Sequence, residues 1–79
     1  MALQGTLATI DGAGTNSVKF GGGTATASGN NSIAIGYNSN AAGNYSTALG
    51  FRAIASGDYS TALGHYANAS ASGSTALGS

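Results

Sequence analysis

The chain has 79 residues, no cysteine, and only four charged residues, which sum to a net charge of zero. A single small domain of this length buries a modest fraction of its surface, so its stability requires either a very regular backbone or self-association. The balanced charge provides no basic patch of the kind that binds nucleic acid. No apolar run reaches the roughly 20 residues of a membrane span. We therefore expect no nucleic-acid partner and no membrane contact by this segment.

The first 13 residues precede the regular part of the sequence, and their larger apolar residues are Leu3, Leu7 and Ile10. Arrays of structural repeats usually need an atypical unit at each end, because a terminal coil leaves a strand edge unpaired. We therefore interpret residues 1–13 as a lead-in or N-terminal cap and residues 14–79 as the repeat domain.

A five-residue motif recurs along the chain and predicts the first strand of a repeating unit. Its clearest form, Ser-Thr-Ala-Leu-Gly, returns every 14 residues. The earliest and most altered copy lies 15 residues before the next one, and we expect the run Gly21-Gly22-Gly23 to absorb the extra residue. The copies occupy residues 17–21, 32–36, 46–50, 60–64 and 74–78.

A second strand is predicted between these copies, at residues 25–29, 39–43, 53–57 and 67–71. From residue 29 onward only two residues separate consecutive strands, and many of them are Asn, Asp or Gly, which tolerate positive φ and favour tight turns. Two strands of about five residues and two tight turns per period are incompatible with a helical repeat and indicate parallel stacking of successive coils. We predict an all-β fold, a two-walled β-solenoid of about five 14-residue coils.

The alternation of side chains along each strand predicts which residues face inward. The uniformly small residues, such as Ala48 and the column Ala27, Ala41, Ala55 and Ala69, fit a thin interior. The larger side chains of the first strand then lie on the outside, and a continuous apolar stripe on a monomer marks an interface. We expect this stripe to pack around the axis of a cyclic assembly. Its residues are Val18, Phe20, Ile33, Ile35, Thr47, Leu49, Thr61, Leu63, Thr75 and Leu77.

Most aromatic residues fall in or beside the turns, where they either contact a ligand or pack on one another along the rod. Arg52 and Asp58 fall in opposite turns, where we expect solvent to surround them. The candidate ligand-contact residues are Tyr37, Tyr45, Phe51, Arg52, Tyr59, His65 and Tyr66.

Catalysis and ice binding are both weakly supported. His65 is the only histidine, no acidic residue recurs near it in the unit, and Ser60, its nearest candidate nucleophile, recurs at every period. We therefore expect a protein that is not an enzyme and has no catalytic residue, cofactor or metal. The threonine rank at Thr47, Thr61 and Thr75 suggests an ice-binding surface, but it shares a face with the leucine stripe.

The repeat closely resembles the YadA-like head repeat of the trimeric autotransporter adhesins. The resemblance rests on Asn31-Ser32-Ile33-Ala34-Ile35-Gly36 with Ser39 three residues further on, and it extends over about residues 14–79. The sequence departs from the family pattern where Thr47, Thr61 and Thr75 replace a Val or Ile, where Lys19 replaces a small Ala, and where Ala71 replaces a Gly.

This resemblance implies a left-handed parallel β-roll assembled as an obligate homotrimer, with the apolar stripe as the trimer interface. It also implies display on the surface of a Gram-negative bacterium, anchored in the outer membrane through parts that this chain does not contain. Family members use the head to hold host extracellular matrix proteins, such as collagen, or other cells. The expected function is thus that of an adhesin head module. The alternative is a purely structural shaft or spacer in a trimeric surface or phage-tail fibre.

Overall fold

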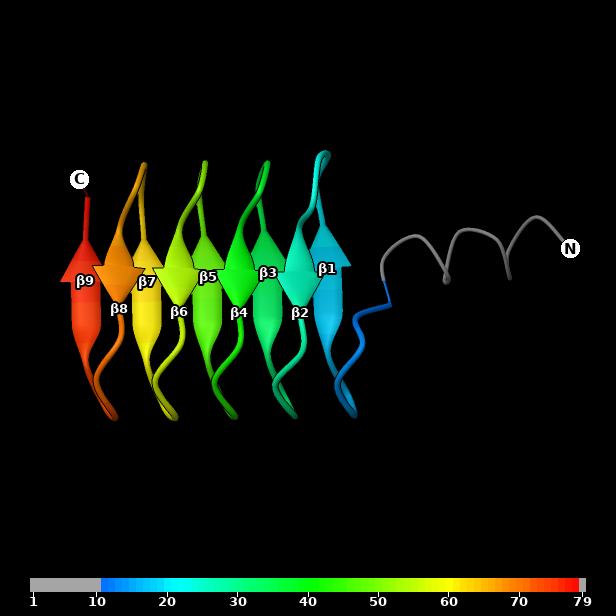
Figure 1. Ribbon diagram of the computed structural model, residues 1–79, viewed down its shortest axis with the longest axis horizontal. Helices are drawn as coiled ribbons and strands as arrows, with labels where there is room; N and C mark the ends of the chain where they lie inside the picture. Colours follow the sequence, from blue (N-terminus) through cyan, green and yellow to red (C-terminus); the bar gives the residue numbers. More distant parts are fainter. Residues whose placement is uncertain (1–10, 79) are drawn as a thin grey trace, which may run out of the picture.

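The structure, a computed structural model, describes residues 11–78, and this part of the chain consists of nine short β-strands joined by tight turns. The strands form two walls of one flat rod (Figure 1). One wall contains β1 (Val18–Phe20), β3 (Ile33–Ile35), β5 (Thr47–Leu49), β7 (Thr61–Leu63) and β9 (Thr75–Leu77). The other contains β2 (Thr26–Ala27), β4 (Asn40–Ala41), β6 (Ile54–Ala55) and β8 (Asn68–Ala69).

Neighbouring strands in each wall are parallel and pair residues one period apart. Thr47 pairs with Thr61 and Leu49 with Leu63, so the register read from the repeat is confirmed. Between β1 and β3 the offset is 15 residues, and it returns to 14 between β2 and β4. The extra residue therefore lies between Phe20 and Thr26, where the glycine run stands, as expected.

The chain winds as a left-handed coil. In Figure 1 the odd-numbered strands run upward behind the even-numbered strands, which run downward, while the chain advances from β1 at the right to β9 at the left. The described residues contain four complete coils followed by β9. The predicted all-β, two-walled parallel β-roll is confirmed, with half a coil less than the five expected.

The strands are shorter than the five-residue segments read from the sequence, with three residues in one wall and two in the other. The flanking serine and glycine positions belong to the corners of the coil instead. The Ser32 Oγ, for example, donates a hydrogen bond of 2.6 Å to the Gly29 carbonyl oxygen three residues earlier, which folds the chain into the strand. Ser39 forms the equivalent bond with Gly36, at 2.8 Å.

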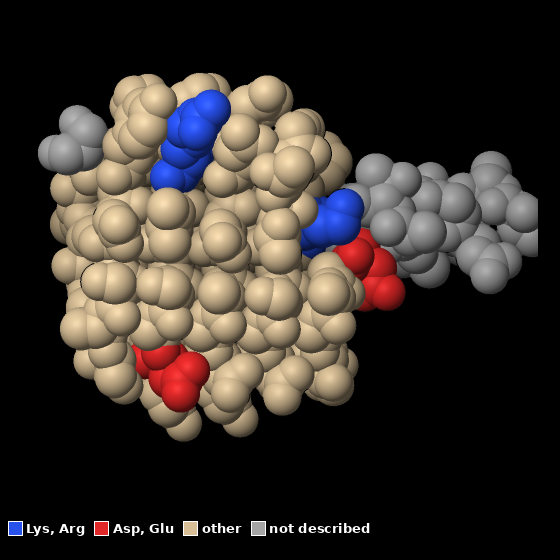
Figure 2. All heavy atoms as spheres, viewed as in Figure 1, with Lys and Arg blue, Asp and Glu red and all other residues tan. Residues whose placement is uncertain are grey.

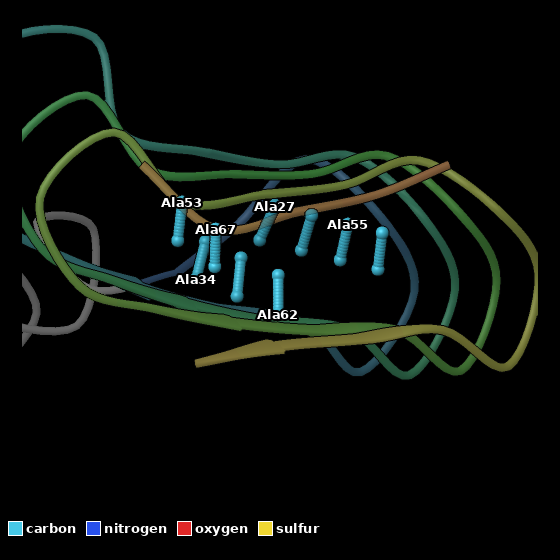
Figure 3. Packing of buried hydrophobic residues seen from close by; sticks show 9 residues of the cluster. Ala27, Ala34, Ala53, Ala55, Ala62 and Ala67 are labelled. Carbon is cyan, nitrogen blue, oxygen red and sulfur yellow. The ribbon is translucent and has the colours of Figure 1, made fainter. Parts of the chain in front are cut away.

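The interior between the walls holds small side chains, as predicted from their alternation. Nine buried alanines form the core cluster, and Figure 3 shows alanines of both walls pointing into the narrow space between them. Buried serines at the corners complete the interior. Because the interior accepts nothing larger, every large apolar side chain of the described residues lies outside it or in the turns.

Residues 11–14 lie against the first coil. Asp11 forms an antiparallel bridge with Val18, and the Gly14 amide donates a 3.1 Å hydrogen bond to the Ala27 carbonyl oxygen. The remainder of the predicted N-terminal cap, with Leu3, Leu7 and Ile10, lies outside the described residues. The boundary between cap and repeat domain stays a prediction.

Candidate functional site

The most conspicuous surface is the outer face of the wall formed by the odd-numbered strands, which we call the apolar stripe. It carries the ten residues predicted as an interface. Ile33 and Ile35 expose about two fifths of their surface (39% and 40%), and Leu77 exposes 71%. Leu49 and Leu63, in the middle of the wall, are half-buried by their neighbours in adjacent coils. A single chain thus presents a continuous apolar surface to water, which is typical of an interface.

A second surface is the turn edge at which each odd-numbered strand passes to the next even-numbered strand; we call it the Arg52 edge. The rings of Tyr37, Phe51 and His65 stack along the rod, with centroid separations of 5.5 and 5.2 Å. Tyr66 meets Phe51 and His65 edge-on, and the Arg52 guanidinium carbon lies 5.5 Å from the centre of the Phe51 ring. These five side chains are exposed and form one aromatic patch with a cationic group.

The opposite turn edge, which we call the Asp58 edge, carries a shorter aromatic stack. Tyr45 and Tyr59 lie 5.0 Å apart with their rings nearly parallel, and both are more than half exposed. Asp58 precedes Tyr59 in its turn. The structure therefore separates the seven candidate ligand-contact residues into five on one edge of the rod and two on the other.

The backbone of these turns is strained at the second turn position, which holds Tyr45, Tyr59, Tyr66 or Arg52 in the later coils. The second residue of each two-residue turn adopts the left-handed conformation, including Tyr45, Arg52, Tyr59 and Tyr66 with φ between 58° and 62°. Asn31 and Asn38 occupy the same position in earlier coils, and asparagine tolerates this conformation better than a tyrosine or arginine does. A non-glycine residue held in this region costs of order 1 kcal/mol, and such positions cluster at functional sites.

Side-chain ladders that the sequence analysis missed hold the turns of successive coils together. Asn30, Asn44 and Asp58 stand one period apart, and the Oδ1 of each accepts a hydrogen bond from a backbone amide of the preceding coil. Asn38 accepts one in the same way from Thr24 on the other edge. The sequence signal is Asn or Asp at the first turn position of one edge and Asn38 at the second turn position of the other, which local turn rules alone explain without any contact between coils.

The described residues contain no group of three or more His, Cys, Asp or Glu residues placed to hold a metal. Ser60 is buried at the start of β7, whereas His65 is exposed beyond its other end, so the structure does not bring these two together. Between residues 11 and 78 no helix is long and apolar enough to cross a membrane.

The fold and these surfaces define a β-solenoid with an exposed apolar face on one wall. The family model of the YadA head domain repeat matches residues 22–39, 27–53 and 55–79, which is more than half of the chain. The chain therefore belongs to the YadA head repeat family, a family of structural adhesin domains from surface-exposed trimeric autotransporters. No curated protein and no solved structure matches it.

Proposed function

We propose that this chain is a non-enzymatic adhesin head module that works as a homotrimer on the surface of a Gram-negative bacterium. Support for the trimer comes from the apolar stripe, because full burial of each Leu or Ile is worth roughly 1.5–3 kcal/mol and a single chain leaves this stripe in water. The family is known to form trimers. Turning the three stripes toward a common axis supplies the large-side-chain core that the alanine interior lacks.

Attachment is proposed to occur through the aromatic residues of the two turn edges. Their support is the combination of exposure and backbone strain: tyrosines occupy left-handed positions that asparagine fills in earlier coils. Tyr and Arg are the residue types that dominate binding energy at protein interfaces. The proposed ligand is a host extracellular matrix protein such as collagen. A trimer presents three copies of each edge, so several copies can bind the same ligand at once and raise the overall affinity. In this proposal an outer membrane anchor in another part of the protein holds the head on the cell.

Light scattering across a dilution series tests the assembly. We expect a mass of three chains that persists on dilution, because burial of the stripe stabilises the folded chain. A stable, folded monomer would overturn the proposed trimer and would show that the apolar stripe is not a trimer interface.

Binding to immobilised collagen tests the attachment. The double variant Tyr45→Ala/Tyr59→Ala is expected to bind about tenfold more weakly, whereas Ser56→Ala, an exposed position on the outer face of the other wall, is expected to bind like the wild type. Light scattering confirms beforehand that both variants keep the wild-type mass. Equal binding by the tyrosine variant would remove these residues from the contact surface. A wild-type trimer with no affinity for matrix proteins would favour the spacer function.

A further inference from the structure

The two turn edges carry opposite charges. Arg52 and Asp58 are the only charged residues after Lys19 in the sequence, and both belong to the same coil, on either side of β6. Figure 2 shows basic atoms at the upper edge of the rod and acidic atoms at the lower edge. The rod is 21 Å wide across the strands, so the two groups cannot form an ion pair within one chain.

Neither charge is required by the fold of its own turn. Asp58 accepts a 3.0 Å hydrogen bond from the Asn44 amide, but Asn44 and Asn30 accept the equivalent bonds in earlier coils without a charge. Arg52 occupies a left-handed position that Asn38 fills one coil earlier. The local backbone would thus be served as well or better by asparagine at both positions. The Arg52 guanidinium contacts the Phe51 ring of its own chain, but the width of the rod keeps Arg52 and Asp58 from pairing with each other within one chain.

A threefold assembly brings these edges together. When three parallel rods turn their apolar stripes toward a common axis, the Arg52 edge of each protomer lies beside the Asp58 edge of its neighbour. Rotation about that axis does not change height along the rod. Because Arg52 and Asp58 flank the same strand, their heights differ by less than the spacing of about 4.8 Å between coils. In such an assembly each Arg52 therefore lies at the level of the neighbouring protomer's Asp58.

We propose that Arg52 of one protomer pairs with the partner's Asp58 at each of the three seams of the trimer, and that this pair sets the axial alignment of the chains. The inference rests on the proposed trimer and names the groups that join its subunits. It also places the Tyr37, Phe51 and His65 stack of one protomer beside the partner's Tyr45 and Tyr59. The ligand-contact surface is then composite, built from two chains at each seam.

Charge reversal tests the pairing. Arg52→Asp places like charges at all three seams, and the trimer is expected to dissociate at a protein concentration about tenfold higher than the wild type, measured by light scattering on dilution. Asp58→Arg is expected to weaken it as well, and also removes the acceptor for the Asn44 amide. The decisive readout is therefore the double variant: adding Arg52→Asp to Asp58→Arg must strengthen the trimer, although the same substitution weakens the wild type.

The Arg52–Asp58 pairing and the trimer itself are contradicted by different results of this experiment. Because the edges are too far apart to pair within one chain, recovery in the double variant can only arise between chains. The differences should shrink in about 1 M salt, where the screening length is about 3 Å. A trimeric wild type whose Arg52→Asp variant dissociates at the same concentration, or a double variant weaker than Asp58→Arg, would overturn the pairing and leave the trimer intact. A monomeric wild type would overturn both.

Discussion

At the scale of single residues, one glycine column determines how closely the coils stack. Gly29, Gly43 and Gly57 have no positive φ, so the requirement at these positions is for space. A Cβ atom at Gly43 would overlap with the carbonyl oxygen of Gly57 in the next coil. Ala71 occupies the equivalent position in the last coil, where the residue is exposed. No carbonyl group of a further described coil lies against it, so a methyl group is tolerated there.

Substitution of Gly43 by alanine is therefore expected to destabilise the fold by roughly 2–3 kcal/mol, because a backbone atom would have to move to admit the methyl group. The matched control is Gly22→Ala, where the nearest atom to the new Cβ is the Tyr37 Cδ2 at 3.5 Å, an ordinary contact. Thermal unfolding followed by circular dichroism measures both. Equal melting temperatures for the two variants would show that the coils have more freedom in their spacing than the structure indicates.

At the scale of the strand, stability depends on keeping each side chain on its own face of the wall. The interior holds only alanine, serine and glycine, and the apolar stripe lies outside it. A shift of one residue along a strand would therefore move the large side chains of the stripe inward and the small side chains outward. Ladders of backbone hydrogen bonds run through strands and turns alike; the Tyr59 amide, for instance, donates to the Asn44 carbonyl oxygen at 2.8 Å. Stacked rings reinforce the turns, with aromatic pairs worth about 0.5–1.5 kcal/mol each beyond their burial.

Two adjacent alanines in the second wall allow a direct comparison of its faces. Ala41 is fully buried, whereas Ala42 is exposed. Ala41→Leu is expected to lose roughly 1–3 kcal/mol of unfolding free energy through overpacking, and Ala42→Leu is expected to stay within about 0.5 kcal/mol of the wild type. Urea denaturation of both variants measures these changes. The reverse order would mean that the second wall presents its other face to the interior.

At the scale of the whole molecule, the chain is a flat rod with a minimal interior and an apolar outer wall. An alanine core buries little apolar area per residue, and no cysteine is present to supply a cross-link. Stability of the folded chain is therefore expected to depend on assembly through the stripe. Because dissociation then accompanies unfolding, the melting temperature should rise with protein concentration.

Substitution of Leu49 by aspartate tests this dependence. In the proposed trimer the variant brings three carboxylates together at an apolar axis, so the trimer should be lost and the melting temperature should fall. The control is Ser56→Asp, which adds the same charge to an exposed position on the opposite wall and should leave the mass unchanged. A Leu49→Asp protein that stays trimeric and melts like the wild type would show that the stripe does not face the axis.

The sequence predicts the period, the parallel register, the two walls and the small residues of the interior, because a 14-residue repeat puts chemically similar side chains at equivalent positions of every coil. It also identified the stripe as the outer face of its wall, since alternation along a strand leaves only that side for Ile35, Leu49 and Leu63. The resemblance to the YadA-like head repeat identified the family, which the family model confirms.

The backbone conformation of the turns could not be predicted from the sequence. Local sequence rules assign left-handed turn positions to Asn and Gly, yet Tyr45, Tyr59 and Tyr66 adopt them too. Contacts between coils outweigh the local cost there, because the Tyr45 and Tyr59 amides and rings each find partners one period away. The stacking of the Tyr37, Phe51 and His65 rings, and of the Tyr45 and Tyr59 rings, likewise follows from the winding of the chain, which brings residues one period apart into contact.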